Sequence, residues 1–115
     1  MDQCLFCKII KKEIPSRVVY EDEKVLAFND VNPQAPVHIL VIPKLHRKSL
    51  LEFQEKEEGS LIVHLFSVVQ KIVKEIGLDQ KGFRLVVNTG QDGGQTVFHL
   101  HFHILGGRFM TWPPG

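Results

Sequence analysis

Three histidines alternate with apolar residues in the segment 97–105 near the C-terminus. His99, His101 and His103 take every second position, and alternate residues of a strand face the same side of a sheet. The sequence therefore predicts a strand with three imidazoles in a row on one face. The opposite face is predicted to enter the core through Phe98, Leu100, Phe102 and Ile104.

Imidazole near neutral pH is a nucleophile, an acid, a base and a metal ligand. Alternate residues of a straight strand are about 6.6 Å apart and the outer pair about 13 Å apart, whereas zinc–nitrogen bonds are about 2.0–2.1 Å long. Two of the three histidines can therefore share a metal ion, but a single site that uses all three is disfavoured. A polar strand face without chemistry is also disfavoured, because the alternation holds over three consecutive histidines.

The segment 89–94, Thr-Gly-Gln-Asp-Gly-Gly, precedes this strand and offers backbone N–H groups to phosphate oxygens. Attack of an imidazole on phosphorus gives a phospho-histidine that water then opens, which divides one slow displacement into two easier steps. The three histidines and this loop therefore predict covalent catalysis at a phosphate.

Hydrophobic patterning predicts the elements that position these residues. Apolar residues recur at three- and four-residue steps over 60–76, which predicts the main helix, with a break at Gly59 and a C-cap at Gly77. A short helical turn is expected at 4–12 and a helix start at 49–54. Strands are expected at 17–20, 24–28, 37–42, 83–88 and 97–105. The pattern is that of an α+β fold, an antiparallel sheet of about five strands with one main helix.

Composition and charge exclude several classes of protein. The 115 residues are enough for one domain with its own core, expected over 1–115. Fourteen basic and 13 acidic side chains give a net charge of +1, without the basic excess of a nucleic-acid binder. No apolar stretch approaches the roughly 20 residues that span a bilayer, and a signal peptide is not apparent. We expect a cytoplasmic protein that binds neither membrane nor nucleic acid.

The predicted main helix is apolar over an arc of about 160°, whereas a helix that rests on one sheet needs only about 100°. Leu61 and Val68 widen this arc. The extra width fits either a broad core contact or a second buried face at a subunit interface. The interpretation favoured here is a homodimer.

The motif His-x-His-x-His-x-x at 99–105, with apolar residues at x, resembles the signature of the histidine-triad (HIT) superfamily. Further segments resemble its Hint-like purine nucleoside phosphoramidase branch, and together they cover nearly the whole chain. These segments are 27–30 (AFND), 33–38 (PQAPVH), 41–44 (VIPK), 87–88 (VN), 92–95 (DGGQ) and 105–115 (LGGRFMTWPPG).

The resemblance implies a hydrolase that cleaves the bond between a nucleoside 5′-monophosphate, AMP above all, and an amine or similar leaving group. His101 would be the nucleophile and His103 would contact the phosphate, while His99 and His38 would orient the other histidines. It places further residues at the phosphate (Asn88, Gly94, Gln95, Thr96), the ribose (Asp30) and the base (Leu5, Phe6, Phe28, Val31), although Leu5 and Val31 also fit an ordinary core.

The resemblance also implies a HIT-like fold whose sheet continues across a homodimer, with the region near Trp112 reaching toward the active site of the partner. Two positions depart from a frequent family pattern. Thr96 stands where many members have serine, which adds a methyl group near the leaving group. Phe98 replaces a frequent tyrosine.

Cys4 and Cys7 have the spacing of metal ligands. His46 and one triad histidine can complete a Cys₂His₂ site, and resemblance to bacterial relatives points to His99. Such a zinc would be structural, because four protein ligands leave no open position, and catalysis would need no cofactor. Two reduced, packed cysteines are the competing interpretation.

Two other functions compete with the phosphoramidase. A dinucleoside polyphosphate hydrolase would use the same chemistry, but the tail at 112–115 resembles the Hint branch instead. A zinc-binding regulatory or scaffold protein would have no turnover. The complete triad, Asn88 and the loop that precedes Gln95 favour an enzyme, because a scaffold has no need of them.

Overall fold

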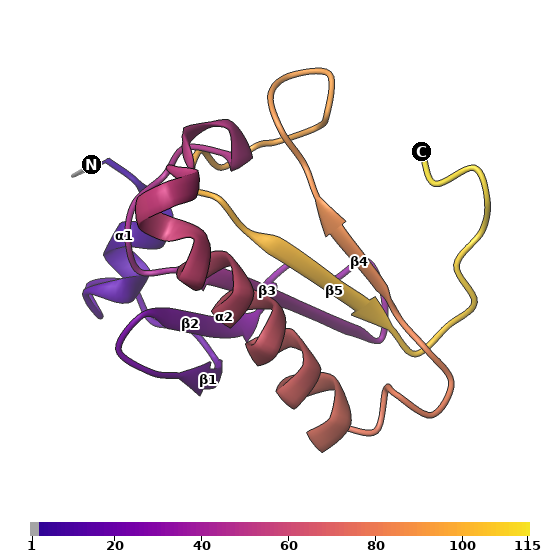
Figure 1. Cartoon of the computed structure of the whole chain (residues 1–115). Helices are drawn as coiled ribbons and strands as arrows, with labels where there is room; N and C mark the ends of the chain where they lie inside the picture. The colour runs from indigo at the N-terminus through magenta and orange to yellow at the C-terminus, as the bar shows by residue number, and fades with distance from the viewer. Residues whose placement is uncertain (1–2) are drawn as a thin grey trace.

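Five strands form one antiparallel sheet in the order β1-β2-β3-β5-β4, in a computed structural model that describes residues 3–115 (Figure 1). The strands are β1 (Val18–Glu21), β2 (Val25–Asn29), β3 (Val37–Pro43), β4 (Arg84–Val87) and β5 (Phe102–Gly106). The helices are α1 (Leu5–Ile10), the 3₁₀ turn η1 (Leu50–Glu52) and α2 (Glu55–Glu75). The predicted α+β architecture is confirmed. Within residues 3–115, no helix combines the length and the apolar character that a membrane span requires.

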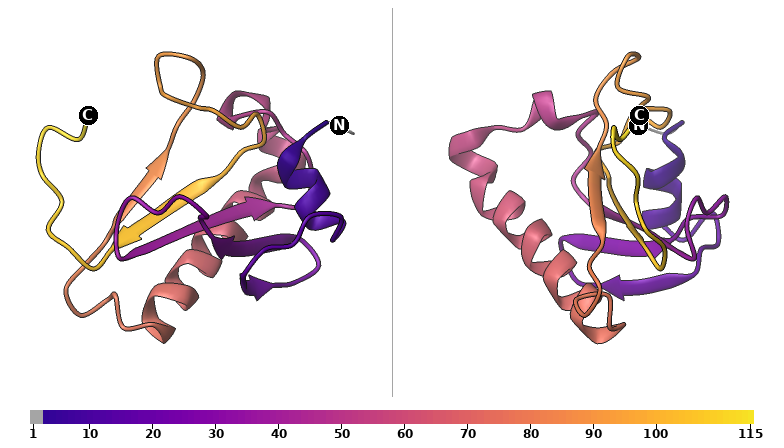
Figure 2. Two further views of the ribbon diagram at one scale, coloured as in Figure 1. Left: turned by 180° about the vertical axis from the view of Figure 1, so that it is seen from behind. Right: turned by 90° about the vertical axis from the view of Figure 1, so that its right-hand side faces the viewer.

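The sheet lies between the two α-helices, with α2 against one face and α1 against the other (Figure 2, right). Strand β2 shows how the sequence builds this layering. Val25 and Ala27 pack in the α2 core, while Leu26 and Phe28 pack in the α1 core. Since alternate residues of a strand face opposite sides, a strand buried on both faces is a continuous apolar run, and β2 is one. The site described below lies on the α1 face.

Helix α2 begins at Glu55, five residues before the predicted start, so Gly59 lies inside the helix. The prediction of a break at Gly59 is wrong. Three glutamates in the first turn interact favourably with the positive end of the helix dipole. One of them, Glu58, also accepts a hydrogen bond from the Gln54 N–H and forms an ion pair with Arg47. These contacts offset the roughly 1 kcal/mol that a glycine costs inside a helix.

The last strand is shorter than predicted, because its pairing with β3 and β4 begins only at Phe102. The five residues before it, 97–101, are not in the sheet. The Leu100 N–H instead donates to the Arg47 carbonyl at 2.7 Å. Phe98 is 56% exposed, so its predicted place in the core is wrong, whereas Leu100, Phe102 and Ile104 are buried as predicted.

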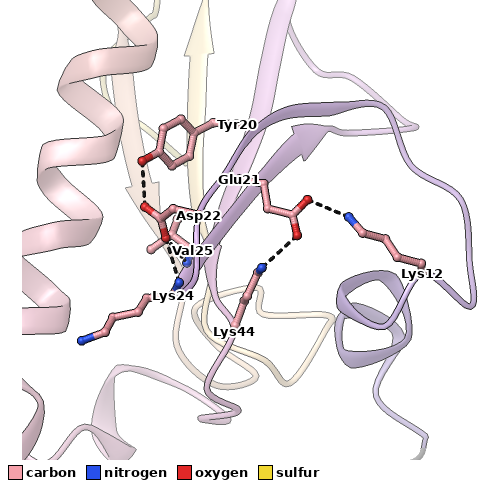
Figure 3. A network of polar contacts seen from close by, with 7 residues as sticks. All are labelled: Lys12, Tyr20, Glu21, Asp22, Lys24, Val25 and Lys44. Atoms are coloured by element: carbon pink, nitrogen blue, oxygen red, sulfur yellow. Dashed lines mark hydrogen bonds and ion pairs between the residues drawn. The ribbon is translucent and has the colours of Figure 1, made fainter.

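A polar network joins the end of α1 to the neighbouring strands (Figure 3). Glu21, at the end of β1, accepts from Lys12 and from Lys44, both at 2.8 Å, and these hydrogen bonds lower the pKa of Glu21. Asp22 accepts from the Tyr20 hydroxyl at 2.7 Å and from two backbone N–H groups of the β1–β2 turn. Exposed ion pairs are worth at most about 1 kcal/mol each, so the network mainly fixes where α1 lies relative to the chain that follows β3.

Candidate active site

A cavity of about 580 Å³ opens on the α1 face of the sheet. Its walls come from α1, from the ends of β2 and β3, and from the segment 96–103. The predicted residues that line it are Leu5, Phe6, Phe28, Asp30, Val31, His38, Thr96, His101 and His103. The sequence did not predict the other lining residues, which are Ile9, Ile14, Pro15, Ser16, Asn29, Asn32, Gln34, Leu40 and Val97. Their signal was weak, because apolar residues fit an ordinary core and Asn, Gln, Pro and Ser fit an ordinary loop equally well.

Three of the predicted phosphate residues, Asn88, Gly94 and Gln95, do not line this cavity. The Gln95 side chain is buried and fully used by the backbone. Its Nε2 donates to the Lys48 carbonyl at 2.6 Å and to the Val97 carbonyl at 3.1 Å, and its Oε1 accepts from a loop N–H at 3.0 Å. Gln95 therefore anchors the glycine-rich loop to two other segments. Val31 is 97% exposed and lies at the rim of the cavity.

The ring of His101 is fixed in one tautomer by its neighbour. Its Nδ1–H donates to the backbone carbonyl of His99 at 2.7 Å, so a neutral His101 carries its lone pair on Nε2. Burial lowers the pKa of His101, and the hydrogen bond to His99 opposes this only in part. A neutral imidazole with a free Nε2 is the form that attacks an electrophile.

A relay of hydrogen bonds fixes the tautomers of His38 and His103. The Gln34 N–H donates to His38 Nδ1 at 3.0 Å, which puts the proton of a neutral His38 on Nε2. That Nε2–H donates to His103 Nδ1 at 2.9 Å. The same His38 Nε2 lies 3.4 Å from a carboxylate oxygen of Asp30. The proton of neutral His103 is therefore on Nε2. Asp30, His38 and His103 are close enough together to hold a metal ion. A proton on His38 Nε2, however, leaves that atom without the lone pair that a metal ligand needs, so this tautomer disfavours a metal site there.

His103 Nε2 is the one buried side-chain nitrogen or oxygen atom in residues 3–115 that has no hydrogen-bond partner. Buried polar groups are nearly always paired, so an unpaired donor here indicates a missing acceptor. The rings of His101 and His103 have centroids 4.9 Å apart. An anion placed against them would accept from His103 while it faced the lone pair of His101.

Burial also makes the stability of the fold depend on pH. Burial and the neighbouring imidazoles of His101 and His38 lower the pKa of His103 to about 4, whereas an unfolded histidine titrates near 6.5. Between these values the unfolded chain binds the extra proton, so the free energy of unfolding falls as the pH drops from about 6.5 to about 4. We expect the Tm to fall over this range and His103→Gln to reduce the slope. A Tm that stays constant over this range would contradict the assignment.

A second polar cluster joins α1 to the triad segment. The Cys4 Sγ lies 3.4 Å from His99 Nδ1, and the Cys7 Sγ lies 3.3 Å from His46 Nδ1 and 3.6 Å from His99 Nδ1. The two Nδ1 atoms are 3.1 Å apart. Two sulfurs and two nitrogens within 4.8 Å of one another thus converge from segments far apart in the sequence.

These four donors fit a zinc ion. Tetrahedral zinc with the usual bond lengths separates its donors by about 3.3–3.8 Å, close to the distances found. His99 Nε2 donates to the Pro43 carbonyl at 2.8 Å, which puts the lone pair of neutral His99 on Nδ1, toward the cluster. Burial and a hydrogen bond with Cys4 raise the pKa of the Cys7 thiol to about 11. A zinc ion would bind Cys7 as the thiolate, so the thiol proton would be released on binding.

The chain is similar in sequence to known proteins over nearly its whole length. The family model described as "HIT domain" matches residues 11–110. An uncharacterised HIT-like protein of Synechococcus elongatus is 54% identical over 114 residues, which are 99% of this chain and 98% of that protein. A "14 kDa zinc-binding protein" of Zea mays is 54% identical over 113 residues, which are 96% of this chain and 87% of that protein.

Solved structures agree with these matches. The crystal structure of a HIT family hydrolase from Legionella pneumophila superposes with a TM-score of 0.95 at 47% identity, covering 98% of this chain and all of that chain. A histidine triad protein from Clostridium difficile gives a TM-score of 0.91 at 56% identity, covering 96% of this chain and 95% of that chain. The chain described here belongs to the HIT family.

Proposed function

We propose that the protein hydrolyses nucleoside 5′-phosphoramidates, with AMP as the nucleotide and an amine as the leaving group. One observation carries this proposal, namely the free Nε2 of His101 beside the unpartnered Nε2–H of His103. A nucleophile and an anion donor on neighbouring rings suit a phosphorus centre. A protein that only bound zinc would need neither.

The reaction would proceed in two displacements at phosphorus. His101 Nε2 attacks, a phosphorus–nitrogen bond to His101 forms and the bond to the amine breaks, while His103 Nε2–H donates to a phosphate oxygen. Water then attacks phosphorus and the bond to His101 breaks. The departing amine takes a proton from solvent in the first step, and the attacking water returns one in the second as its hydroxyl bonds to phosphorus, so that one water is consumed overall. Residues of this chain supply the nucleophile and the donor to the phosphate oxygen.

The rest of the cavity suits a nucleoside. Phe6 and Phe28 meet edge to face with centroids 5.5 Å apart and form an apolar wall for a base, with Leu5 and Val31 at its edge. Asp30 also lines the cavity. Its carboxylate is held in place by a hydrogen bond that it accepts from the Asn32 N–H at 2.8 Å. A carboxylate in this place would accept hydrogen bonds from ribose hydroxyls. The preference for a purine rests on the family resemblance.

The experiment that tests the function compares two substrates. Adenosine 5′-phosphoramidate should give AMP and ammonia with rapid turnover, and diadenosine tetraphosphate should be cleaved far more slowly. Chromatography of the nucleotides measures both reactions. If only the tetraphosphate is cleaved, the protein is a dinucleoside polyphosphate hydrolase. If neither is cleaved, the zinc-scaffold interpretation replaces this one.

We also propose that the Cys4–Cys7–His46–His99 cluster holds one structural zinc, since four protein donors leave no open coordination position. Zinc is expected at one ion per chain by elemental analysis, and Cys7→Ser should lose it together with several degrees of Tm. His64→Ala is the control, because His64 bonds to Asp22 outside the cluster and should keep the metal. Equal zinc content in the two variants would contradict this site.

A homodimer is proposed at the partly exposed apolar side of α2 where Phe66 packs on Phe102 of β5, together with the free edge of β4. Val63 and Phe66 are 68% and 49% exposed, and β4 is an edge strand of the sheet. Apolar helix surface and an unpaired strand edge are features that a second subunit can cover. Light scattering after gel filtration should give twice the mass of the chain, and a charged residue at Phe66 should shift the protein toward the monomer.

A further inference from the structure

His99 belongs to two sites at once. Its side chain lies in the Cys4–Cys7–His46–His99 cluster, while its backbone carbonyl accepts the Nδ1–H of His101 at 2.7 Å. The residue is fully buried, and its second ring nitrogen is bound to the Pro43 carbonyl. One residue thus connects the cluster to the ring that carries the nucleophilic nitrogen.

The carbonyl of His99 is not held in place by the sheet. Strand pairing begins at Phe102, and residues 97–101 lie outside the ladder. The Leu100 N–H is bound to the Arg47 carbonyl, one residue after His46. That N–H belongs to the same peptide unit as the His99 carbonyl, so the position of the carbonyl depends on two anchors: the Arg47 carbonyl next to His46, and the His99 side chain held by the cluster and Pro43.

Helix α1 makes a second connection between the two sites. It has only six residues, too few to be stable alone, and Cys4 caps it by accepting the Cys7 N–H at 3.3 Å. On the same helix, Phe6 packs edge-on against the rings of His99 and His101, with centroids 6.0 and 5.1 Å away. The helix that supplies Cys7 and is capped by Cys4 is thus also a wall of the nucleotide cavity.

We propose that the zinc-loaded cluster is the positioning device of the active site, with Cys4, Cys7 and His46 acting as positioning residues that hold His101 through His99. This inference rests on the proposed function and goes beyond it, because it makes zinc content control the rate of attack at phosphorus. The bound metal supplies orientation and no catalytic chemistry. A nucleophile displaced by about 1 Å can lose about 10²-fold in rate.

His46→Ala is the variant of choice, because His46 contacts the cluster and does not line the nucleotide cavity. We expect zinc to be lost and kcat to fall about 10- to 100-fold, the scale of loss for a nucleophile displaced by about 1 Å, with a smaller change in KM. The readout independent of turnover is the His101 Nδ1–H proton in nuclear magnetic resonance, without substrate. Its hydrogen-bonded signal should be sharp in the zinc-loaded protein and broadened or lost in His46→Ala.

Two controls separate positioning from general stability. His46→Cys keeps a zinc ligand and should restore zinc, the His101 signal and most of kcat. Val69→Ala weakens the α2 core, away from the cluster, and should lower the Tm while leaving the signal and kcat near those of the unmodified protein. If Val69→Ala costs as much kcat as His46→Ala, stability rather than positioning explains the effect.

The inference is overturned if His46→Ala loses zinc and still keeps both kcat and the His101 signal, or if the unmodified protein holds no zinc. Failure of the proposed function gives a different result. In that case no phosphoramidate is cleaved, yet the His101 signal still follows zinc content. The magnetic resonance measurement therefore decides the inference even if the substrate assignment is wrong.

Discussion

His101→Ala lowers the rate of AMP release from adenosine 5′-phosphoramidate by about 10³-fold or more, which is the scale of loss when a catalytic nucleophile is removed. No other described side chain can take its place, because the proton of His103 sits on Nε2 and His99 is turned away toward the cysteines. Initial rates of AMP formation under saturating substrate measure the loss.

Two control measurements show whether the loss is specific to His101. His101→Ala should still bind AMP, since Phe6, Phe28 and Asp30 remain in the cavity, and calorimetry would show it. His64→Ala, a histidine change remote from the cavity, should leave the rate unchanged. A His101→Ala protein that retains more than a tenth of the original kcat would mean that another group attacks phosphorus.

His38→Ala is expected to lower kcat by about 10²-fold with little change in the AMP affinity, because partners that fix a catalytic tautomer are worth about 10–100-fold. His38 Nε2–H is the donor that holds the proton of His103 on Nε2. Without that donor, His103 can carry its proton on Nδ1 and then presents a lone pair, instead of an N–H, to the phosphate.

A matched variant tests the tautomer argument. His38→Gln keeps an N–H donor near the position of Nε2 and should recover part of the lost kcat, whereas His38→Phe keeps the ring volume without a donor and should not. Steady-state rates of all three variants at one pH provide the comparison. If His38→Phe is as active as His38→Gln, His38 acts through packing and the proposed relay is wrong.

Local patterns were enough to predict the layers of the fold. The apolar run of β2 and the periodicity of α2 each record which side chains are buried, so five strands and one main helix followed from them. The errors have local causes. Gly59 is tolerated inside α2 because the glutamates of the first turn and Arg47 stabilise the helix start, and such contacts depend on the tertiary structure.

The candidate site was predictable in its residue types but not in its geometry. Alternation predicted His99, His101 and His103 on one face of a strand. The rings of His101 and His103 are indeed neighbours, but the strand begins only at Phe102 and His99 turns toward the cysteines. The convergence of His99 with Cys4, 95 positions away, cannot be read from spacing within a strand. Gln95 shows the same limit, since its amide binds the Lys48 carbonyl 47 residues away instead of facing the cavity.

Mass spectrometry of a quenched reaction tests most directly whether His101 becomes covalently bound to the nucleotide. Protein mixed with excess adenosine 5′-phosphoramidate, stopped within one turnover and digested, should carry an adenylyl group on the peptide that contains His101. The His101→Ala protein should carry none. An adenylyl group on a different residue would contradict covalent attack by His101. Turnover without any adduct would contradict it too, if it is found both in the unmodified protein and in His38→Ala, in which formation and breakdown of the intermediate are slowed together.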